Sequence, residues 1–254
     1  MFLKLIVFAA VLLISSKSIA DETITLTTGE YPPYNSESIQ HNGLVPRIVT
    51  EAFRTQGVQV KYAFFPWSRA YELSKRGDYD GSAQWFYSDE RAEYHYYSDV
   101  IMEETMVWFH LKDTSFNWDD LSDLKPYKIG AMKGYTYTDE FYDLIDQGEL
   151  NVDFSNRIEI PYQKLLKNRI EVFPETLDIG LHVLRKNYPA ETADLFTYHP
   201  KPLVKANTHL IFPIINPQSR RLLALFNRGL SLIKQNGLYE KIFLESRQGK
   251  FEAG

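Results

Sequence analysis

The sequence predicts an α/β protein with two lobes. Short stretches in which apolar and polar residues alternate, as they do in β-strands, are followed by stretches with apolar residues three or four positions apart, as in helices. This alternation runs from residue 24 to residue 83 and begins again at residue 128. A chain of 254 residues is long enough for two lobes of about 100 residues each. Strands that alternate with helices are typical of a mainly parallel sheet covered by helices.

The first unit has the pattern strand–helix–strand–helix–strand. The periodicity predicts strands at 24–26, 58–64 and 79–83 and helices at 45–53 and 67–76. Gly57 and Gly77 follow the two helices. Glycine commonly ends a helix because it adopts the left-handed backbone conformation without strain. We therefore expect these five elements to form the framework of one lobe.

A second unit follows a polar stretch at residues 113–123. Strands are predicted at 128–132, 152–154 and 170–173, and helices at 136–145, 162–168 and 177–186. Extended apolar runs at 105–111 and 207–215 flank this unit, and amphipathic helices at 217–233 and 238–245 follow it. We infer that the chain crosses between the lobes twice and that its C-terminal part returns to the first lobe.

The N-terminus has the pattern of a secretory signal peptide. Lys4 provides a positive start, residues 5–14 are an unbroken apolar run, and small residues Ser18 and Ala20 precede a cleavage point after Ala20. A transmembrane anchor is the alternative. Ten apolar residues rise only ~15 Å as a helix, about half of the hydrocarbon core of a bilayer. We therefore expect export to the periplasm with cleavage after Ala20.

Composition excludes several classes of function. The formal net charge is −5, which argues against a nucleic acid partner. The chain has no cysteine, so it has no disulfide, no thiol nucleophile and no thiolate metal site. The sequence lacks GxSxG, HExxH and phosphate-binding glycine motifs, and its six histidines are scattered without metal-ligand spacing. Adjacent acids such as Glu103 and Glu104 are interpreted as solvated faces or caps. The sequence therefore predicts a protein without cofactor, metal or enzymatic activity.

Several segments together resemble family 3 of the bacterial periplasmic solute-binding proteins, the receptors for polar amino acids of ABC transporters. In chain order they are GEYPPY at 29–34, NGL at 42–44, FPW at 65–67, GDYDG at 77–81, SDERA at 88–92, YSD at 97–99, KIGAMKGYTY at 128–137, FNRGL at 226–230 and NGLYEKI at 236–242. Each motif alone is weak, but their order and spacing extend over nearly all of residues 22–248.

The resemblance implies a type II clamshell whose two lobes are joined by two hinge strands. Lobe 1 is then expected at 22–108 plus 208–250, lobe 2 at 113–203, and the hinge crossings near 105–112 and 204–213. A monomer of this family holds a small polar, amino-acid-like ligand in the cleft and delivers it to an ABC permease of the inner membrane. Two alternatives stay open, a ligand sensor that binds a partner and a dehydratase-like enzyme on the same fold.

Arg91 is the first candidate for ligand binding. It lies three residues after Ser88, a good helix N-cap, so its guanidinium is expected beside free backbone N–H groups, which suits a carboxylate. The resemblance implies a carboxylate-binding arginine at this position. The alternative is a surface salt bridge with Asp89, Glu90 or Glu93.

Aromatic residues are expected to form walls of the cleft. Tyr31 and Tyr34 flank a Pro-Pro turn after the first strand, and Trp67 is either a third wall or the apolar start of its helix. An aromatic face attracts an ammonium group. The resemblance also places Gln84 and Phe86 at the ligand, where related proteins have glycine, serine and threonine. This replacement predicts a more aromatic pocket, so "amino-acid-like" is meant broadly.

The second lobe is expected to contribute four residues. The resemblance implies ligand contacts from Met132, Tyr135 and Thr136, and Thr136 is also a plausible N-cap of the helix that follows. Glu175 is expected either to hold the ligand ammonium or to lie in the first turn of the next helix, favoured there by the helix dipole. The register leaves open whether Glu175 or Thr176 occupies the ammonium position.

Overall fold

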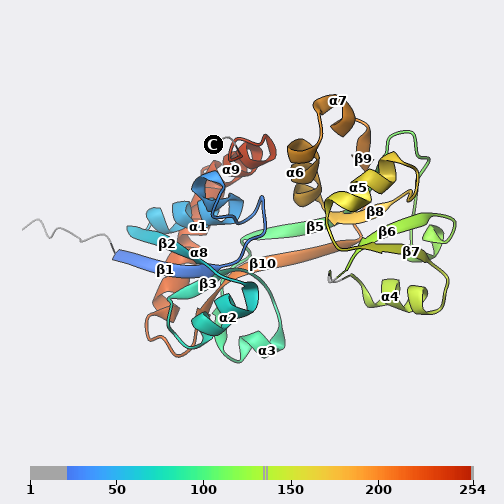
Figure 1. The fold of residues 1–254 in the computed structure, drawn as a ribbon. Coiled ribbons are helices and arrows are strands. Elements are labelled where there is room, and N and C mark those ends of the chain that lie inside the picture. The colour runs from blue at the N-terminus through green and yellow to red at the C-terminus, as the bar shows by residue number, and fades with distance from the viewer. Residues whose placement is uncertain (1–21, 134, 136, 253–254) are drawn as a thin grey trace, which may run out of the picture.

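The computed structural model describes residues 22–133, 135 and 137–252. The predicted signal peptide at residues 1–20 and the predicted site residue Thr136 lie outside the described residues. Two groups of helices and strands are joined by two long strands, β5 (Met102–Leu111) and β10 (Val204–Pro213) (Figure 1). Among the described helices, none combines the length and the apolar composition that crossing a bilayer requires.

Lobe 1 is built on the sheet order β2-β1-β3-β10, with β4 also paired to β10. Its strands are β1 (Glu22–Thr28), β2 (Val58–Phe64), β3 (Gly81–Phe86) and β4 (His95–Tyr97). Its helices are η1 (Gln40–Asn42), α1 (Leu44–Arg54), α2 (Trp67–Lys75), α3 (Asp89–Ala92), α8 (Ser219–Gln235) and α9 (Leu238–Arg247). Strand β1 runs parallel to β2 and β3, whereas β10 runs antiparallel to β3 and β4.

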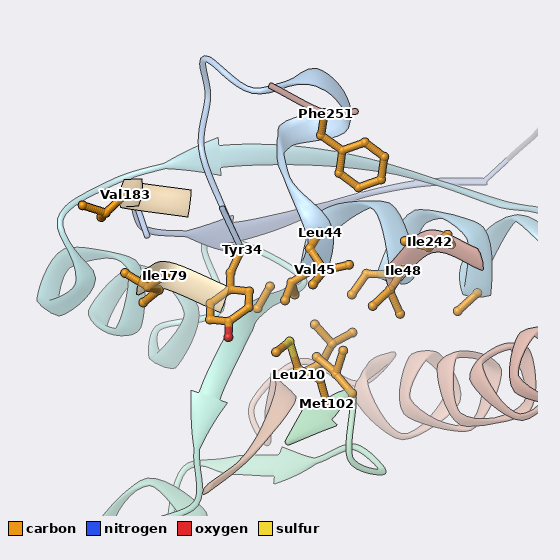
Figure 2. Close-up of a cluster of buried hydrophobic side chains, with 14 of the residues drawn as sticks. Tyr34, Leu44, Val45, Ile48, Met102, Ile179, Val183, Leu210, Ile242 and Phe251 are labelled. Carbon is orange, nitrogen blue, oxygen red and sulfur yellow. The ribbon is translucent and has the colours of Figure 1, made fainter. Parts of the chain in front are cut away.

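Helix α1 anchors the core of lobe 1. Its apolar residues at 44, 45, 48, 49, 52 and 53 repeat with helical spacing and are all buried. Helix α8 packs closely on it because Gly229 has no side chain; a Cβ there would lie 2.0 Å from the carbonyl oxygen of Ala52. Ile179 and Val183 of α6 in lobe 2 extend the same cluster (Figure 2). The core is therefore continuous between the lobes on this side of the molecule.

Lobe 2 combines a short parallel pair of strands with an antiparallel extension of β5. Strands β6 (Lys128–Met132) and β7 (Asn151–Ser155) are parallel, and β5 pairs with β8 (Phe173–Thr176) and β9 (Phe196–Tyr198). A single bridge between Ile129 and Val172 links the two sets. The helices are η2 (Leu121–Leu124), α4 (Asp139–Asp146), α5 (Glu159–Leu166), α6 (Leu177–Asn187) and α7 (Ala190–Ala193).

The two crossing strands are hydrogen-bonded to each other. Their antiparallel register runs from the pair Met102–Thr208 to the pair Met106–Val204. Beyond these pairs β5 continues into lobe 2 and β10 continues into lobe 1. The chain therefore passes between the lobes twice, once through β5 and once through β10, and these two strands are hydrogen-bonded to each other where they cross.

Several element boundaries differ from the sequence-based prediction. Helix α4 begins at Asp139 because Thr138, and not Thr136, is its N-cap; the Thr138 hydroxyl accepts a hydrogen bond from the Phe141 N–H at 3.2 Å. Strand β3 extends to Phe86, so Gln84 and Phe86 lie within it. Strand β8 begins at Phe173, since pairing with β5 rather than the local apolar run determines where it lies.

Helix α6 of lobe 2 also contacts the C-terminal segment of lobe 1. The Arg247 guanidinium donates to both carboxylate oxygens of Asp178, at 2.7 and 3.3 Å, and the Tyr34 hydroxyl donates to Asp178 at 3.3 Å. Glu252 pairs with His182 at 2.8 Å and with Arg185 at 2.7 Å. These contacts, together with the shared apolar cluster, hold α6 against α9 next to the crossing strands.

Replacement of Asp178 by asparagine should destabilise the protein. The Asp178 side chain is only 10% exposed, whereas its partner Arg247 is 50% exposed. We expect Asp178→Asn to lower the free energy of unfolding by roughly 1–2 kcal/mol, less than for a fully buried pair because Arg247 regains water. Urea denaturation measures this change.

Glu149→Gln is the matched control, because it breaks the Lys125–Glu149 pair, whose side chains are 47% and 39% exposed. Its cost should stay below about 0.5 kcal/mol. Equal losses in the two variants would show that the α6–α9 ion pair contributes no more than a surface pair.

Candidate ligand-binding site between the lobes

A cavity of about 440 Å³ lies between the two lobes. Lobe 1 contributes Tyr31, from the loop after β1, and Phe86, at the end of β3; lobe 2 contributes Tyr135, Tyr137 and Thr176. The crossing strands contribute Glu104 and Met106 from β5 and Val204 and Ala206 from β10. The volume lies within the range of small-molecule sites, and most of the lining is apolar or aromatic.

The strand register explains why these side chains meet. Residues directly opposite each other in an antiparallel pair project to the same face, and residues two apart in a strand share a face. Glu104 is opposite Ala206, and Met106 is opposite both Val204 and Thr176. The crossing ladder therefore forms the floor of the cavity, with Glu104 as its only acid among the lining residues.

Glu104 is a buried carboxyl group held by neutral donors. It is 5% exposed, and its Oε1 accepts a hydrogen bond from Gln84 Nε2 at 2.8 Å. Its Oε2 accepts a longer bond of 3.4 Å from the Tyr31 hydroxyl. Burial raises the pKa of Glu104 to about 7, against the opposing effect of these two hydrogen bonds. No ion pair of the described residues includes Glu104.

A bulge in β3 aims Gln84 at Glu104. Between the pairs Ser82–Ile211 and Trp85–His209, β3 has one residue more than β10. Gln84 lies in this bulge with φ of 64°, a conformation that non-glycine residues rarely adopt. The Gln84 amide donates to Glu104, and its carbonyl oxygen accepts a hydrogen bond from Asn35 Nδ2. Gln84 therefore positions Glu104 and does not itself line the cavity.

Glu175 is a second buried acid beside the same aromatic side chains. It is fully buried in β8, not in the first turn of α6, and its Oε1 accepts a hydrogen bond from the Thr176 N–H at 2.7 Å. Its Oε2 meets no donor at hydrogen-bond distance among the described atoms, although the Tyr135 hydroxyl lies close enough to act on the carboxyl group. Burial raises the pKa of Glu175 to about 8 against the opposing effect of the Thr176 N–H and the Tyr135 hydroxyl, and the charge of Glu104 adds a smaller increase. The Glu175 charge in turn raises the pKa of the Tyr31 and Tyr135 hydroxyls, beyond the larger effect of their burial.

Arg91 does not line the cavity but contacts Phe86, which does. The Ser88 hydroxyl caps α3 by accepting a hydrogen bond from the Arg91 N–H at 3.2 Å, which confirms the predicted N-cap. The guanidinium donates to the Phe86 carbonyl oxygen at 3.3 Å and lies 5.2 Å from the Trp85 ring centroid. In the described part of the chain Arg91 forms no ion pair with Asp89, Glu90 or any other acid. Guanidinium donors therefore remain for a carboxylate.

Two of the three predicted aromatic walls lie elsewhere. Tyr34 is 0% exposed and packs among the core residues of lobe 1 (Figure 2), so it does not line the cavity. Its hydroxyl donates to Asp178. Trp67 packs edge-on against Trp85, with ring centroids 5.4 Å apart, in a small apolar cluster at the start of α2. It also meets Tyr31 edge-on at 6.5 Å, so its place is behind the wall that Tyr31 forms.

The loop between β6 and α4 supplies different residues from those expected. Met132 is 5% exposed and belongs to the core, whereas Tyr135 lines the cavity. Tyr137, which the sequence did not suggest, also lines it, and its hydroxyl accepts a hydrogen bond from the Met132 N–H at 2.8 Å. Among the described residues no cluster of His, Asp and Glu side chains is arranged to hold a metal ion.

The interpretation of Glu103 and Glu104 as a solvated pair was wrong for Glu104. Glu103 is exposed and pairs with Lys205 at 2.7 Å, but Glu104 is buried under the cavity. Adjacent residues of a strand point to opposite faces, so only one of two neighbouring acids can be solvated when the other face is covered. If the predicted crossing strand had begun before residue 103, the alternation of faces would have predicted one exposed and one buried acid.

The two raised pKa values predict an unusual pH dependence of stability. A buried carboxyl whose pKa rises from an ordinary 4.5 to about 8, as for Glu175, keeps its proton in the folded protein after the unfolded chain has lost it. The folded state then binds more protons, so the free energy of unfolding falls as pH increases from about 4.5 to about 8, by up to ~1.4 kcal/mol per pH unit for each group.

Urea denaturation of the ligand-free protein across this pH range tests the prediction. Glu175→Gln removes the contribution of Glu175, so the variant should gain stability relative to wild type as pH increases. A difference between the two proteins that is constant with pH would contradict the raised pKa.

Comparisons with known proteins agree with this architecture. The sequence model of the bacterial extracellular solute-binding proteins, family 3, matches residues 24–245. The second substrate-binding domain of GlnP from Lactococcus lactis, in an open conformation, is 18% identical with a TM-score of 0.70, covering 92% of this chain and 97% of that chain. The unliganded, open L-cystine solute receptor of Neisseria gonorrhoeae is 18% identical with a TM-score of 0.69, covering 88% and 92%.

A histidine kinase sensor domain with similarity to periplasmic binding proteins is also 18% identical, with a TM-score of 0.61 and coverage of 91% and 96%. At these identities the structures show a shared fold, and they confirm the predicted type II clamshell. A search of proteins with curated descriptions gave no match to the sequence.

Proposed function

Since the chain belongs to family 3 of the bacterial extracellular solute-binding proteins, we propose that it captures an amino acid or a related small zwitterion between its lobes. The capture is reversible and non-covalent, takes place in the periplasm after removal of residues 1–20, and delivers the ligand to an ABC permease of the inner membrane. The observation that carries this proposal is the cavity, because both lobes and both crossing strands line it.

Each end of a zwitterion has a candidate partner. Arg91 takes the carboxylate, since its guanidinium lies beside Phe86 without an acid of its own. Glu175 takes the ammonium, since it is a buried acid next to the hydroxyl of Tyr135, which lines the cavity. Tyr31, Phe86 and Tyr135 cover the apolar part of the ligand, and aromatic faces also attract cations.

Capture requires a relative movement of the lobes. Within the residues that the structure describes, the two groups of elements are connected covalently only through β5 and β10, so a small rotation about these strands opens or closes the cavity. A ligand that contacts both lobes stabilises the closed arrangement by its differential affinity. A sensor would use the same capture step; co-purification with a permease, rather than with a receptor, separates transport from sensing.

A thermal-shift series with amino acids, organic acids and polyamines tests capture. A ligand present at 100 times its Kd stabilises the folded protein by about 2.7 kcal/mol, so at least one zwitterion should raise the melting temperature clearly. Absence of a shift with every zwitterion in the series would contradict the proposed ligand class.

Arg91→Ala should weaken binding of that zwitterion by roughly 10- to 100-fold, the effect of losing a charge-assisted hydrogen bond. Arg76→Ala is the matched control, because Arg76 pairs with Asp78 on an exposed surface of lobe 1, at 2.7 Å. Titration calorimetry gives both affinities. Equal affinities of the two variants would show that Arg91 does not hold the ligand.

A further inference from the structure

Glu104 places a buried carboxyl group on the floor of the cavity, and the capture of a simple zwitterion does not use it. Resting on the proposed function, we infer that Glu104 is a second cation subsite and that the ligand carries two cationic groups joined by a short aliphatic chain. Basic amino acids and linear diamines share this chemistry.

The position of Glu104 is the first support. It projects from β5 into the cavity in register with Ala206 and Met106, and Gln84, from the β3 bulge, fixes its Oε1. The left-handed backbone of Gln84, with φ of 64°, is energetically unfavourable for a non-glycine residue. Such strain is found mostly at functional sites, and bulges of this kind reorient a side chain. The position of Glu104 on β5 and the bulge in β3 together orient this carboxylate toward the cavity.

The absence of a protein counter-charge is the second support. The hydrogen bonds to Glu104 come from an amide and a hydroxyl, both neutral, and no ion pair of the described residues includes it. By contrast Asp178, the nearby acid on α6, is neutralised by Arg247. An ionised carboxylate buried without a cation is unfavourable, and a cationic ligand group removes that penalty.

The numbers of acidic and cationic side chains at the cavity indicate which charges the ligand carries. Two acids, Glu104 and Glu175, are buried near Tyr31 without cations, and their charges act on each other. One cation, Arg91, contacts Phe86 of the cavity wall. A zwitterion with a neutral side chain has one cationic group for two acids. A basic amino acid matches all three protein charges, and a diamine matches the two acids alone.

The walls between the charged groups suit a methylene chain. Met106, Val204 and Ala206 form an apolar surface on the floor beside Glu104, and Tyr31, Phe86 and Tyr137 provide aromatic surfaces. Aliphatic carbons bury favourably against such walls, and an ammonium group near a tyrosine ring gains a further attraction. The mainly apolar lining offers few partners for a neutral polar side chain such as a carboxamide.

Calorimetry with L-lysine, L-ornithine, putrescine and L-norleucine tests the inference, because norleucine keeps the aliphatic chain of lysine and lacks the second amino group. Wild-type protein should bind its preferred dicationic ligand at least about tenfold more tightly than norleucine. In Glu104→Gln, which keeps the size and hydrogen-bonding capacity of the side chain, that ratio should fall to near one.

Glu103→Gln is the matched control, because Glu103 is the exposed neighbour on the same strand and pairs with Lys205. It should keep the wild-type ratio. Thermal denaturation of all three proteins shows whether each variant is folded before the affinities are compared.

The pH profile of affinity gives a readout that a structural role would not change. A bound cation favours ionised Glu104, so the affinity of the dicationic ligand should increase as pH rises toward about 7 and then level off. The groups that face Glu104 are Tyr31 and Tyr34 from the loop after β1, Gln84 from β3, and Asp178 from α6. Glu175 on β8 adds a similar dependence toward about 8. In Glu104→Gln only the part due to Glu175 should remain.

Three outcomes separate the inference from the proposed function. Norleucine binding as tightly as lysine, or an unchanged ratio in Glu104→Gln, overturns the second cation subsite and leaves zwitterion capture intact. Putrescine binding without any amino acid supports the subsite and contradicts the role of Arg91. Absence of binding by all four compounds, and by every zwitterion of the thermal-shift series, overturns both.

Discussion

The antiparallel pairing of β5 with β10 is the interaction on which the rest of the structure depends. The two strands are the only covalent route between the two groups of elements in the described chain, and their pairing sets the register of the side chains on the floor of the cavity. A slip of one residue would turn Glu104 away from the cavity and bring the exposed Glu103 toward it, because strand side chains alternate between faces. The connection between the lobes and the chemistry of the site are therefore fixed by the same backbone hydrogen bonds.

The acidic side chains on the two sides of this ladder differ in whether a cation of the protein pairs with them. On one side α6 and α9 meet through a shared apolar cluster and through the ion pairs of Asp178 and Glu252. At the cavity, Glu104 and the neighbouring Glu175, which does not itself line the cavity, have no cation of their own in the described chain. Charges that maintain the fold are thus neutralised within the protein, whereas those at the cavity are left for a ligand. The cost of burying them is part of what a bound cation recovers.

The sequence was sufficient for the fold because the fold rests on local patterns. The helical spacing of residues 45–53 predicted the buried face of α1, and the restart of the strand–helix alternation predicted the second lobe. Ser88 predicted the cap of α3 because capping is a local interaction. Thr136 was the wrong choice of cap for α4, since two threonines, at 136 and 138, fit the same local rule and only the backbone path selects Thr138.

The site was less accessible from sequence because it is assembled from distant segments. Tyr34 and Tyr31 are three residues apart and chemically identical, yet one lies in the core and the other lines the cavity. Glu104 acquires its role through Gln84, 20 residues away, and Ala206, 102 residues away. No local pattern encodes these partners; a strand assignment that included residues 103 and 104 would have been needed to separate their environments.

We propose that the lobes close about β5 and β10 on a ligand held at the cavity. The chain has no cysteine, so two introduced cysteines can carry spin labels without background. Glu72 on α2 and Glu140 on α4 are exposed and lie in different lobes, on the same side of the crossing strands (Figure 1). Pulsed electron resonance should show that the distance between the labels shortens and its distribution narrows when a ligand identified by calorimetry is added. An unchanged distance with the ligand bound would contradict closure.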